Sequence, residues 1–184
     1  MKDPREIIDH LSFTDAVSIL RTLADSDEAL ARRIVEIALA RLHGVDPEEV
    51  AAVLYDQLGA LEVEEVWDRA GETRHGYVEP GEAADQMVEE VLEPFLEELG
   101  KYQKLGMNAE ANMMCMGLLL GLHRFEHEST SEFKDWAPDA PTVFAEAVVD
   151  TWKEDSPDYA DIAEVKTFVE GELGGWQACV MADG

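Results

Sequence analysis

Apolar residues recur every three to four positions along most of the chain, and this spacing predicts α-helices rather than strands. The first predicted helix starts at Ser12, with Asp15 three residues later as in a capping box. The second starts near Asp27 and ends at Gly44, where a glycine suits the end of a helix. In the first helix one apolar stripe is expected, formed by Ala16, Ile19, Leu20 and Leu23. In the second we expect these residues to face inward: Leu30, Ile34, Ile37, Ala38 and Leu42.

The middle of the chain continues this helical pattern. A third helix opens at Asp46-Pro47, since proline at the first helical position loses no hydrogen bond, and runs to Gly59. A short fourth helix contains Trp67 and closes at Gly71. Residues 72–79 lack periodicity, so we expect a loop there.

Two long helices are expected next. The pattern from Gly81 to about Leu105 holds Pro94 inside it, which predicts a kink or a break. The segment from Asn108 to Glu126 is apolar almost all round, as expected of a central, buried helix.

The last part of the chain predicts a second loop, 127–141, and two further helices separated by Pro157. No strand pattern persists. We therefore expect an all-α fold of about eight helices in stacked antiparallel pairs, an α-solenoid similar to HEAT or TPR arrays, with an irregular helical bundle as the alternative. Residues 1–173 are expected to form one domain, and 174–184 an irregular tail.

The net charge of the chain excludes some classes of binding partner. The 184 residues include 41 Asp and Glu against 14 Lys and Arg, a net charge of −27. This balance argues against direct binding of nucleic acid or of an anionic membrane surface. The acidity suits a cytoplasm of high salt concentration, as in halophilic adaptation, or a face that docks a basic partner, and we keep both explanations.

Compartment and redox chemistry follow from the apolar runs and the cysteines. The longest apolar run, from Met113 to Leu122, is too short to span a bilayer. The N-terminus shows no secretory signal. Cys115 and Cys179 supply neither a disulfide framework nor a zinc quartet. We expect a cytoplasmic protein.

The segment 67–80 is the most distinctive, because it gathers Trp67, Arg69, Arg74 and Tyr77 in an otherwise acidic, aliphatic chain. Together with Trp136 in the second loop, these residues are candidates for binding a protein partner. The arginines alternatively suit a small anionic ligand carrying a carboxylate or a phosphate. A third interpretation is a tethered connector, in which the arginines pair with neighbouring carboxylates and Trp67 and Tyr77 pack underneath.

His123, Glu126 and His127 match the H-x-x-E-H spacing of inverted zinc peptidases. On a helix the two histidines lie one turn apart and can share a metal, with Glu126 as general base. Such a site needs a third protein ligand, which the sequence does not identify. Two imidazoles near a helix C-terminus, where positive charge is favourable, are the simpler interpretation. Zinc is therefore the cofactor only of this alternative, and otherwise we expect no cofactor.

A resemblance supports the helical interpretation. The runs 67–71, 76–80, 92–96 and 136–139 (WDRAG, GYVEP, LEPFL and WAPD) resemble a helical region of archaeal and bacterial proteins of uncharacterised function, which in some of them follows a SWIM-type zinc finger. The resemblance covers roughly residues 46–141 and implies an α-helical, repeat-like interaction module. It implies no zinc finger here, because Cys115 and Cys179 do not supply the C-x-C…C-x-H ligands, and no catalytic residues are carried over.

These observations favour a non-catalytic helical module that binds a protein, either a basic partner or a second copy of itself. A small metal-dependent hydrolase is the alternative from another class.

Overall fold

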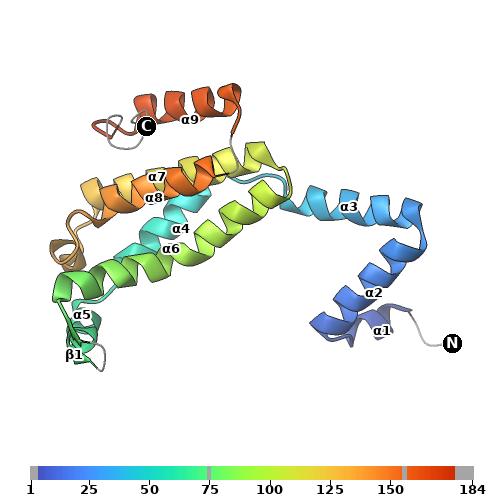
Figure 1. Ribbon diagram of the computed structural model, residues 1–184, viewed down its shortest axis with the longest axis horizontal. Helices are drawn as coiled ribbons and strands as arrows, with labels where there is room; N and C mark the ends of the chain where they lie inside the picture. Colours follow the sequence, from blue (N-terminus) through green and yellow to red (C-terminus); the bar gives the residue numbers. More distant parts are fainter. Residues whose placement is uncertain (1–3, 74–75, 155–156, 177–184) are drawn as a thin grey trace. The chain divides into compact units, whose positions relative to one another are not determined.

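The computed structural model describes residues 4–73, 76–154 and 157–176, and most of them are helical (Figure 1). The chain forms two compact units, Met1–Gly44 and Val45–Gly184, where we expected one domain. The elements are α1 (Pro4–Asp9), α2 (Phe13–Ser26), α3 (Glu28–Leu42), α4 (Pro47–Gly59), α5 (Val63–Arg69), β1 (Gly71–Thr73), β2 (Gly76–Val78), α6 (Pro80–Lys104), α7 (Asn108–Glu128), the 3-10 helix η1 (Glu132–Asp135), α8 (Ala140–Lys153) and α9 (Tyr159–Glu172). The expected all-α fold is confirmed.

The first unit is a helical hairpin of α2 and α3, preceded by the short helix α1, which the periodicity did not predict. Both hairpin helices start where expected. The Ser12 hydroxyl accepts a hydrogen bond from the Asp15 backbone N–H at 3.2 Å, and the Asp27 carboxylate accepts from the N–H groups of Ala29 and Leu30. These caps satisfy N–H groups that the first turn of a helix leaves unpaired.

The apolar stripe of α3 is less buried than we predicted. Leu30, Ile34 and Leu42 are half-buried, but Ile37 and Ala38 are exposed. No residue of α2 or α3 is buried. The prediction that Ile37 and Ala38 face inward is wrong, because in a two-helix hairpin each helix has one neighbour, which covers only part of a broad stripe.

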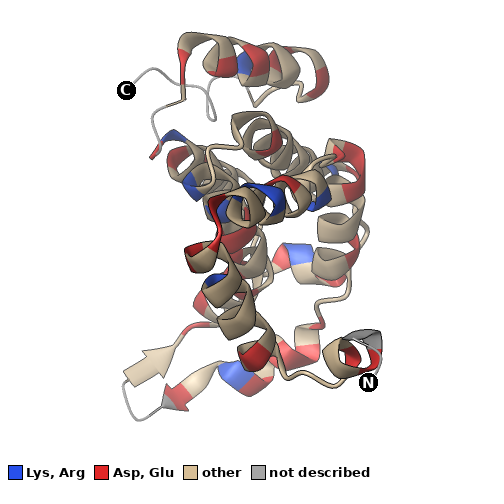
Figure 2. Cartoon of the chain, turned by 90° about the vertical axis from the view of Figure 1, so that its right-hand side faces the viewer, with Lys and Arg blue, Asp and Glu red and all other residues tan. Residues whose placement is uncertain are grey.

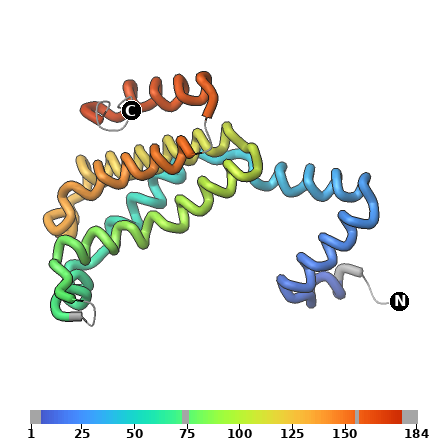
Figure 3. Tube along the Cα trace, viewed as in Figure 1, coloured from blue at the N-terminus to red at the C-terminus, as the bar shows by residue number. Residues whose placement is uncertain are grey.

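The second unit is built around α7, as its all-round apolar surface predicted. Helices α4, α6, α8 and α9 all pack on α7 (Figure 3), and thirteen of its residues are buried. In a solenoid each repeat contacts only its neighbours in sequence, whereas α4 reaches α7 across α5 and α6. The packing within this unit therefore matches the helical bundle. No helix in the described ranges is long and apolar enough to cross a membrane.

Two glycines let α4 and α7 approach closely. A Cβ atom at Gly117 would lie 2.7 Å from the Val50 Cβ and 2.9 Å from the Pro47 carbonyl oxygen. A Cβ atom at Gly121, one turn later, would lie 3.0 Å from the Ala51 carbonyl oxygen. These distances are shorter than ordinary van der Waals contacts, so Gly117 has no space for a side chain, and a side chain at Gly121 would require its neighbours on α4 to move by a few tenths of an ångström.

Asn112 is a buried polar residue on α7, and its side chain is fully used. Its Oδ1 accepts a hydrogen bond from the Trp152 indole at 3.0 Å, and its Nδ2 donates to Asp161 at 2.7 Å and to Glu164 at 2.9 Å. Trp152 belongs to α8, and the two carboxylates belong to α9. One buried amide thus holds two helices against α7.

The structure bears on two local expectations. Helix α6 runs unbroken from Pro80 to Lys104, so of the kink or break expected at Pro94 the break does not occur. Packing of α6 against α5, α7 and α8 compensates for the hydrogen bond that proline cannot donate. The expected loop 72–79 contains a small antiparallel pair, β1 and β2, in which Glu72 faces Tyr77. Three-residue strands are too short for an alternating pattern to reveal them in the sequence.

We predict that Gly117→Ala lowers the free energy of unfolding by about 1–3 kcal/mol, because the methyl group overpacks the contact between α4 and α7. Gly100→Ala is the matched control: it also lies inside a helix, but nothing lies within 4 Å of its added Cβ. The control is expected to be neutral, or more stable by up to about 1 kcal/mol, because alanine favours helices. Urea denaturation of both variants measures the difference, and equal effects would show that the contact is not tight.

Candidate functional site

Trp67 on α5 and Trp136 at the end of η1 form an aromatic pair. Their ring centroids lie 4.8 Å apart with an interplanar angle of 76°, an edge-to-face arrangement. Trp67 is 55% exposed and Trp136 is half-buried. The structure thus brings together two predicted binding residues that are 69 positions apart in the sequence, and it leaves one of them open to solvent.

Local capping and burial position Trp136. It follows η1, where the Ser131 hydroxyl accepts a hydrogen bond from the Phe133 backbone N–H at 3.3 Å. The Phe133 side chain is fully buried. The cap and the buried Phe133 fix this turn to the core. The turn positions the Trp136 ring against Trp67.

Arg69 binds a carboxylate from another helix. Its Nη1 lies 2.7 Å from Glu90 Oε1, and the two side chains are 37% and 60% exposed. An ion pair this exposed contributes at most about 1 kcal/mol to stability. The bridge nevertheless ties the end of α5 to α6, and it leaves the Arg69 guanidinium already neutralised.

Of the other two residues predicted in this segment, only Tyr77 lies in the described part of the chain. Tyr77 lies on β2 and is 61% exposed. Gly71 and Gly76 have φ angles of +113° and +132°, which side chains rarely adopt, so glycine is required where the hairpin begins and turns. Arg74 lies outside the described residues. Because Trp67 and Tyr77 are exposed, they do not pack underneath the segment as the connector interpretation expected.

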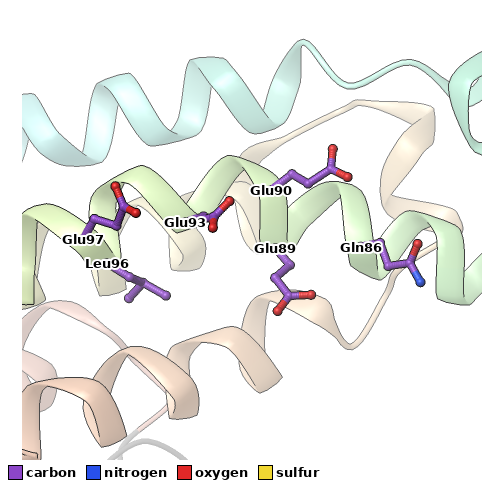
Figure 4. Close-up of a pocket in the computed structure, with 6 residues that line it drawn as sticks. All are labelled: Gln86, Glu89, Glu90, Glu93, Leu96 and Glu97. Atoms are coloured by element: carbon purple, nitrogen blue, oxygen red, sulfur yellow. The ribbon is translucent and has the colours of Figure 1, made fainter.

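One face of α6 carries a shallow acidic groove that we did not predict. It has a volume of about 600 Å³, and Figure 4 shows its lining residues along this single helix: Gln86, Glu89, Glu90, Glu93, Leu96 and Glu97. Their spacing of three and four positions places them on one side of the helix. The chain has 41 acidic residues, so glutamates at this spacing occur on many helices and do not identify a groove. Only the packing of the helices shows that this face of α6 is left uncovered.

Glu90 belongs both to this groove and to the ion pair with Arg69, so the groove reaches the end of α5, the helix that carries Trp67. Asp139, in the same loop as Trp136, adds negative charge near the start of α6. Partial burial raises the pKa of Asp85 on α6, and the charge of Asp139 raises it further. Residues 45–184 contain 33 Asp and Glu against eight Lys and Arg, which are coloured red and blue along the ribbon in Figure 2. We call Trp67, Arg69, Trp136 and the groove residues the aromatic–acidic surface; its charge favours a cationic ligand over an anionic one.

The H-x-x-E-H residues form a different kind of cluster at the end of α7. The rings of His123 and His127 stack with centroids 4.2 Å apart, and the edge of Trp176 meets His123 at 5.2 Å. The Trp176 indole donates a hydrogen bond to Glu126 Oε2 at 2.7 Å. Glu126 therefore fixes the segment after α9 onto the end of α7.

This arrangement does not fit a zinc site. His127 Nδ1 lies 3.0 Å from the His123 carbonyl oxygen and 3.3 Å from Glu126, and the Glu126 carboxylate is engaged by Trp176. Among the described residues, no three His, Cys, Asp or Glu side chains converge to hold a metal ion. A catalytic zinc site needs three such protein ligands and an open position.

Burial shifts the titration of His123. The His123 side chain is half-buried, and within the described structure its Nε2 has no hydrogen-bond partner. Burial lowers the pKa of His123, and nearby His127 lowers it further, whereas the Gly174 backbone, Glu126 and Glu128 oppose the change. The folded state therefore favours a neutral imidazole at this position.

Comparison with known proteins gives no relative. No family model matches the chain, and searches of curated proteins and of solved structures found no significant match. The resemblance of segments 67–71, 76–80, 92–96 and 136–139 to a helical, repeat-like family therefore stays a prediction.

We predict that acidification destabilises the protein partly through His123. Its folded-state pKa lies below that of the unfolded chain, so as the pH falls from about 6.5 the unfolded chain takes up the proton first. The stabilisation is fully present above pH 6.5 and is lost below it. The free energy of unfolding of wild type should thus fall more steeply between pH 7.5 and 5.5 than that of His123→Gln. Parallel curves from urea denaturation would contradict this prediction.

Proposed function

We propose that this chain is a non-catalytic helical interaction module that binds a basic protein partner through the aromatic–acidic surface. The observation that carries the proposal is the exposed Trp67, which packs edge-to-face on Trp136 and lies on α5, the helix that Arg69 ties to the row of glutamates on α6. Protein interfaces concentrate binding energy in such aromatic residues and surround them with a polar rim.

Charge selects the kind of partner. The groove presents four glutamates, and only Glu90 among them has an ion pair that the structure shows, with Arg69. A partner with Lys and Arg around one apolar anchor would pair with these glutamates while its anchor contacts Trp67. Complementary charge increases the association rate and makes it sensitive to salt. An anionic ligand would instead have to displace Glu90 from Arg69 and approach the remaining glutamates.

A displayed peptide library tests the proposal. Selection against the full-length chain should enrich sequences rich in Lys and Arg that contain an aromatic or aliphatic anchor. Synthetic versions of the enriched peptides are then titrated by fluorescence anisotropy. We expect Trp67→Ala to weaken their binding about 10-fold or more, as is usual for a central aromatic residue of an interface.

The acidic groove has its own test. Glu89→Gln with Glu93→Gln should weaken binding several-fold and reduce its dependence on salt, because two attractive charges are lost. The matched control, Glu146→Gln with Glu170→Gln, makes the same change in net charge at exposed positions on α8 and α9. If Trp67→Ala and Arg69→Ala lower only the thermal stability while the peptides bind with unchanged affinity, the proposed surface is wrong. An effect of the control equal to that of the groove variant would show that only overall charge matters.

A further inference from the structure

The first unit, Met1–Gly44, leaves much of its apolar surface uncovered. It has 44 of the 184 residues, yet it holds eight of the fifteen large apolar side chains that are exposed in the described chain. Their exposed fractions range from 39% at Leu23 to 85% at Phe13. The eight side chains are Ile7, Ile8, Phe13, Ile19, Leu20, Leu23, Val35 and Ile37.

A unit of this size has few means of stabilising itself. Chains near or below about 40 residues usually need disulfides, a metal or association with another chain. Neither cysteine of the protein, Cys115 or Cys179, lies in this unit. Among its described residues no group of side chains suits a metal ion. Association is therefore the remaining way to bury the stripes of α2 and α3.

The charge of this unit differs sharply from that of the rest of the chain. Residues 1–44 contain six Lys and Arg and eight Asp and Glu, a net charge of −2, whereas residues 45–184 contain eight and 33, a net charge of −25. Two arginines of α3 are also paired within the helix, Arg32 with Glu28 at 2.6 Å and Arg33 with Glu36 at 2.9 Å. Two copies of the second unit repel each other, but two copies of the first do not.

This balance is what a contact between identical surfaces requires. In a twofold symmetric dimer the same patch lies on both sides, so a patch with one sign of charge would repel itself. Two hairpins packed on their apolar faces form a four-helix bundle, which buries the stripes of all four helices.

We propose that the α2–α3 hairpin is a homodimerisation element whose occupant is the same hairpin of a second copy of this chain. On α2, Ile19, Leu20 and Leu23 cluster on one side of the helix within two turns, and they form the centre of the contact. This inference is independent of the proposed function, because it uses a different unit and an apolar rather than an electrostatic contact.

Sedimentation equilibrium of the full-length chain tests the proposal. Wild type should form a species of twice the 20.5 kDa chain mass, with a concentration-dependent equilibrium. Ile19→Glu with Leu23→Glu should raise the dimer dissociation constant by about 100-fold or more, because each copy brings two charges into an apolar contact. Glutamate is a good helix former, so α2 keeps its helical preference. The matched control, Val53→Glu with Val143→Glu, adds the same charge at exposed apolar positions of α4 and α8, and it should leave the constant within about threefold.

A measurement on wild type alone avoids the risk that a variant unfolds. Hydrogen exchange of amides in residues 13–42 should slow as the protein concentration rises through the dimer range, while exchange in α7 should not change. Salt separates this proposal from the previous one: between 0.1 and 1 M salt the dimer should persist or tighten, whereas binding of basic peptides should weaken. A monomer at every concentration overturns the proposal, and so does a dimer that Ile19→Glu with Leu23→Glu does not weaken.

Discussion

The second unit depends on the close contact between α4 and α7. Gly117 and Gly121 face α4 at distances that leave no space for a side chain at Gly117 and very little at Gly121. Because α4 lies against α7 there, α7 is covered on that side, and α6, α8 and α9 cover it elsewhere. The core follows from this arrangement: a central helix that is apolar all round needs neighbours on every side, and two glycines allow the closest of them to approach. The buried Asn112 then fixes α8 and α9 through Trp152 and the two carboxylates of α9.

The acidity of the protein is unevenly distributed, and this changes its meaning. A uniform net charge of −27 would favour an explanation by solvent alone. Instead the hairpin unit is nearly neutral, and its uncovered surface is apolar, whereas the bundle carries almost all the excess charge. The first surface suits association with an identical surface, and the second suits a cationic partner. A dimer formed through the hairpins would present two aromatic–acidic surfaces, so a partner with two basic segments would bind with a higher effective affinity.

The sequence contained much of the candidate site but not its geometry. Trp67, Arg69, Tyr77 and Trp136 were recognisable because aromatic and basic residues are unusual in this acidic, aliphatic chain. That Trp67 touches Trp136, and that Arg69 binds Glu90, depends on how η1 and α6 pack beside α5, which periodicity does not specify. The groove on α6 could not be chosen from so many acidic residues. The H-x-x-E-H pattern gave the correct spacing for two histidines one turn apart, but their rings stack and Glu126 binds Trp176.

Local sequence determined the helices, since caps and apolar spacing act within a few residues of each other. Ser12, Asp27 and Asp46 each begin a helix where the pattern placed one. The all-round apolar α7 was likewise recognisable as the central helix before its neighbours were known. Only the tertiary structure decided that Pro94 leaves α6 unbroken and that 71–73 and 76–78 pair as β-strands. It also decided that Ile19, Leu20 and Leu23 of α2 and Ile37 of α3 stay exposed. The physical reason is that burial depends on which helices become neighbours, and a repeating apolar pattern specifies a face without specifying what covers it.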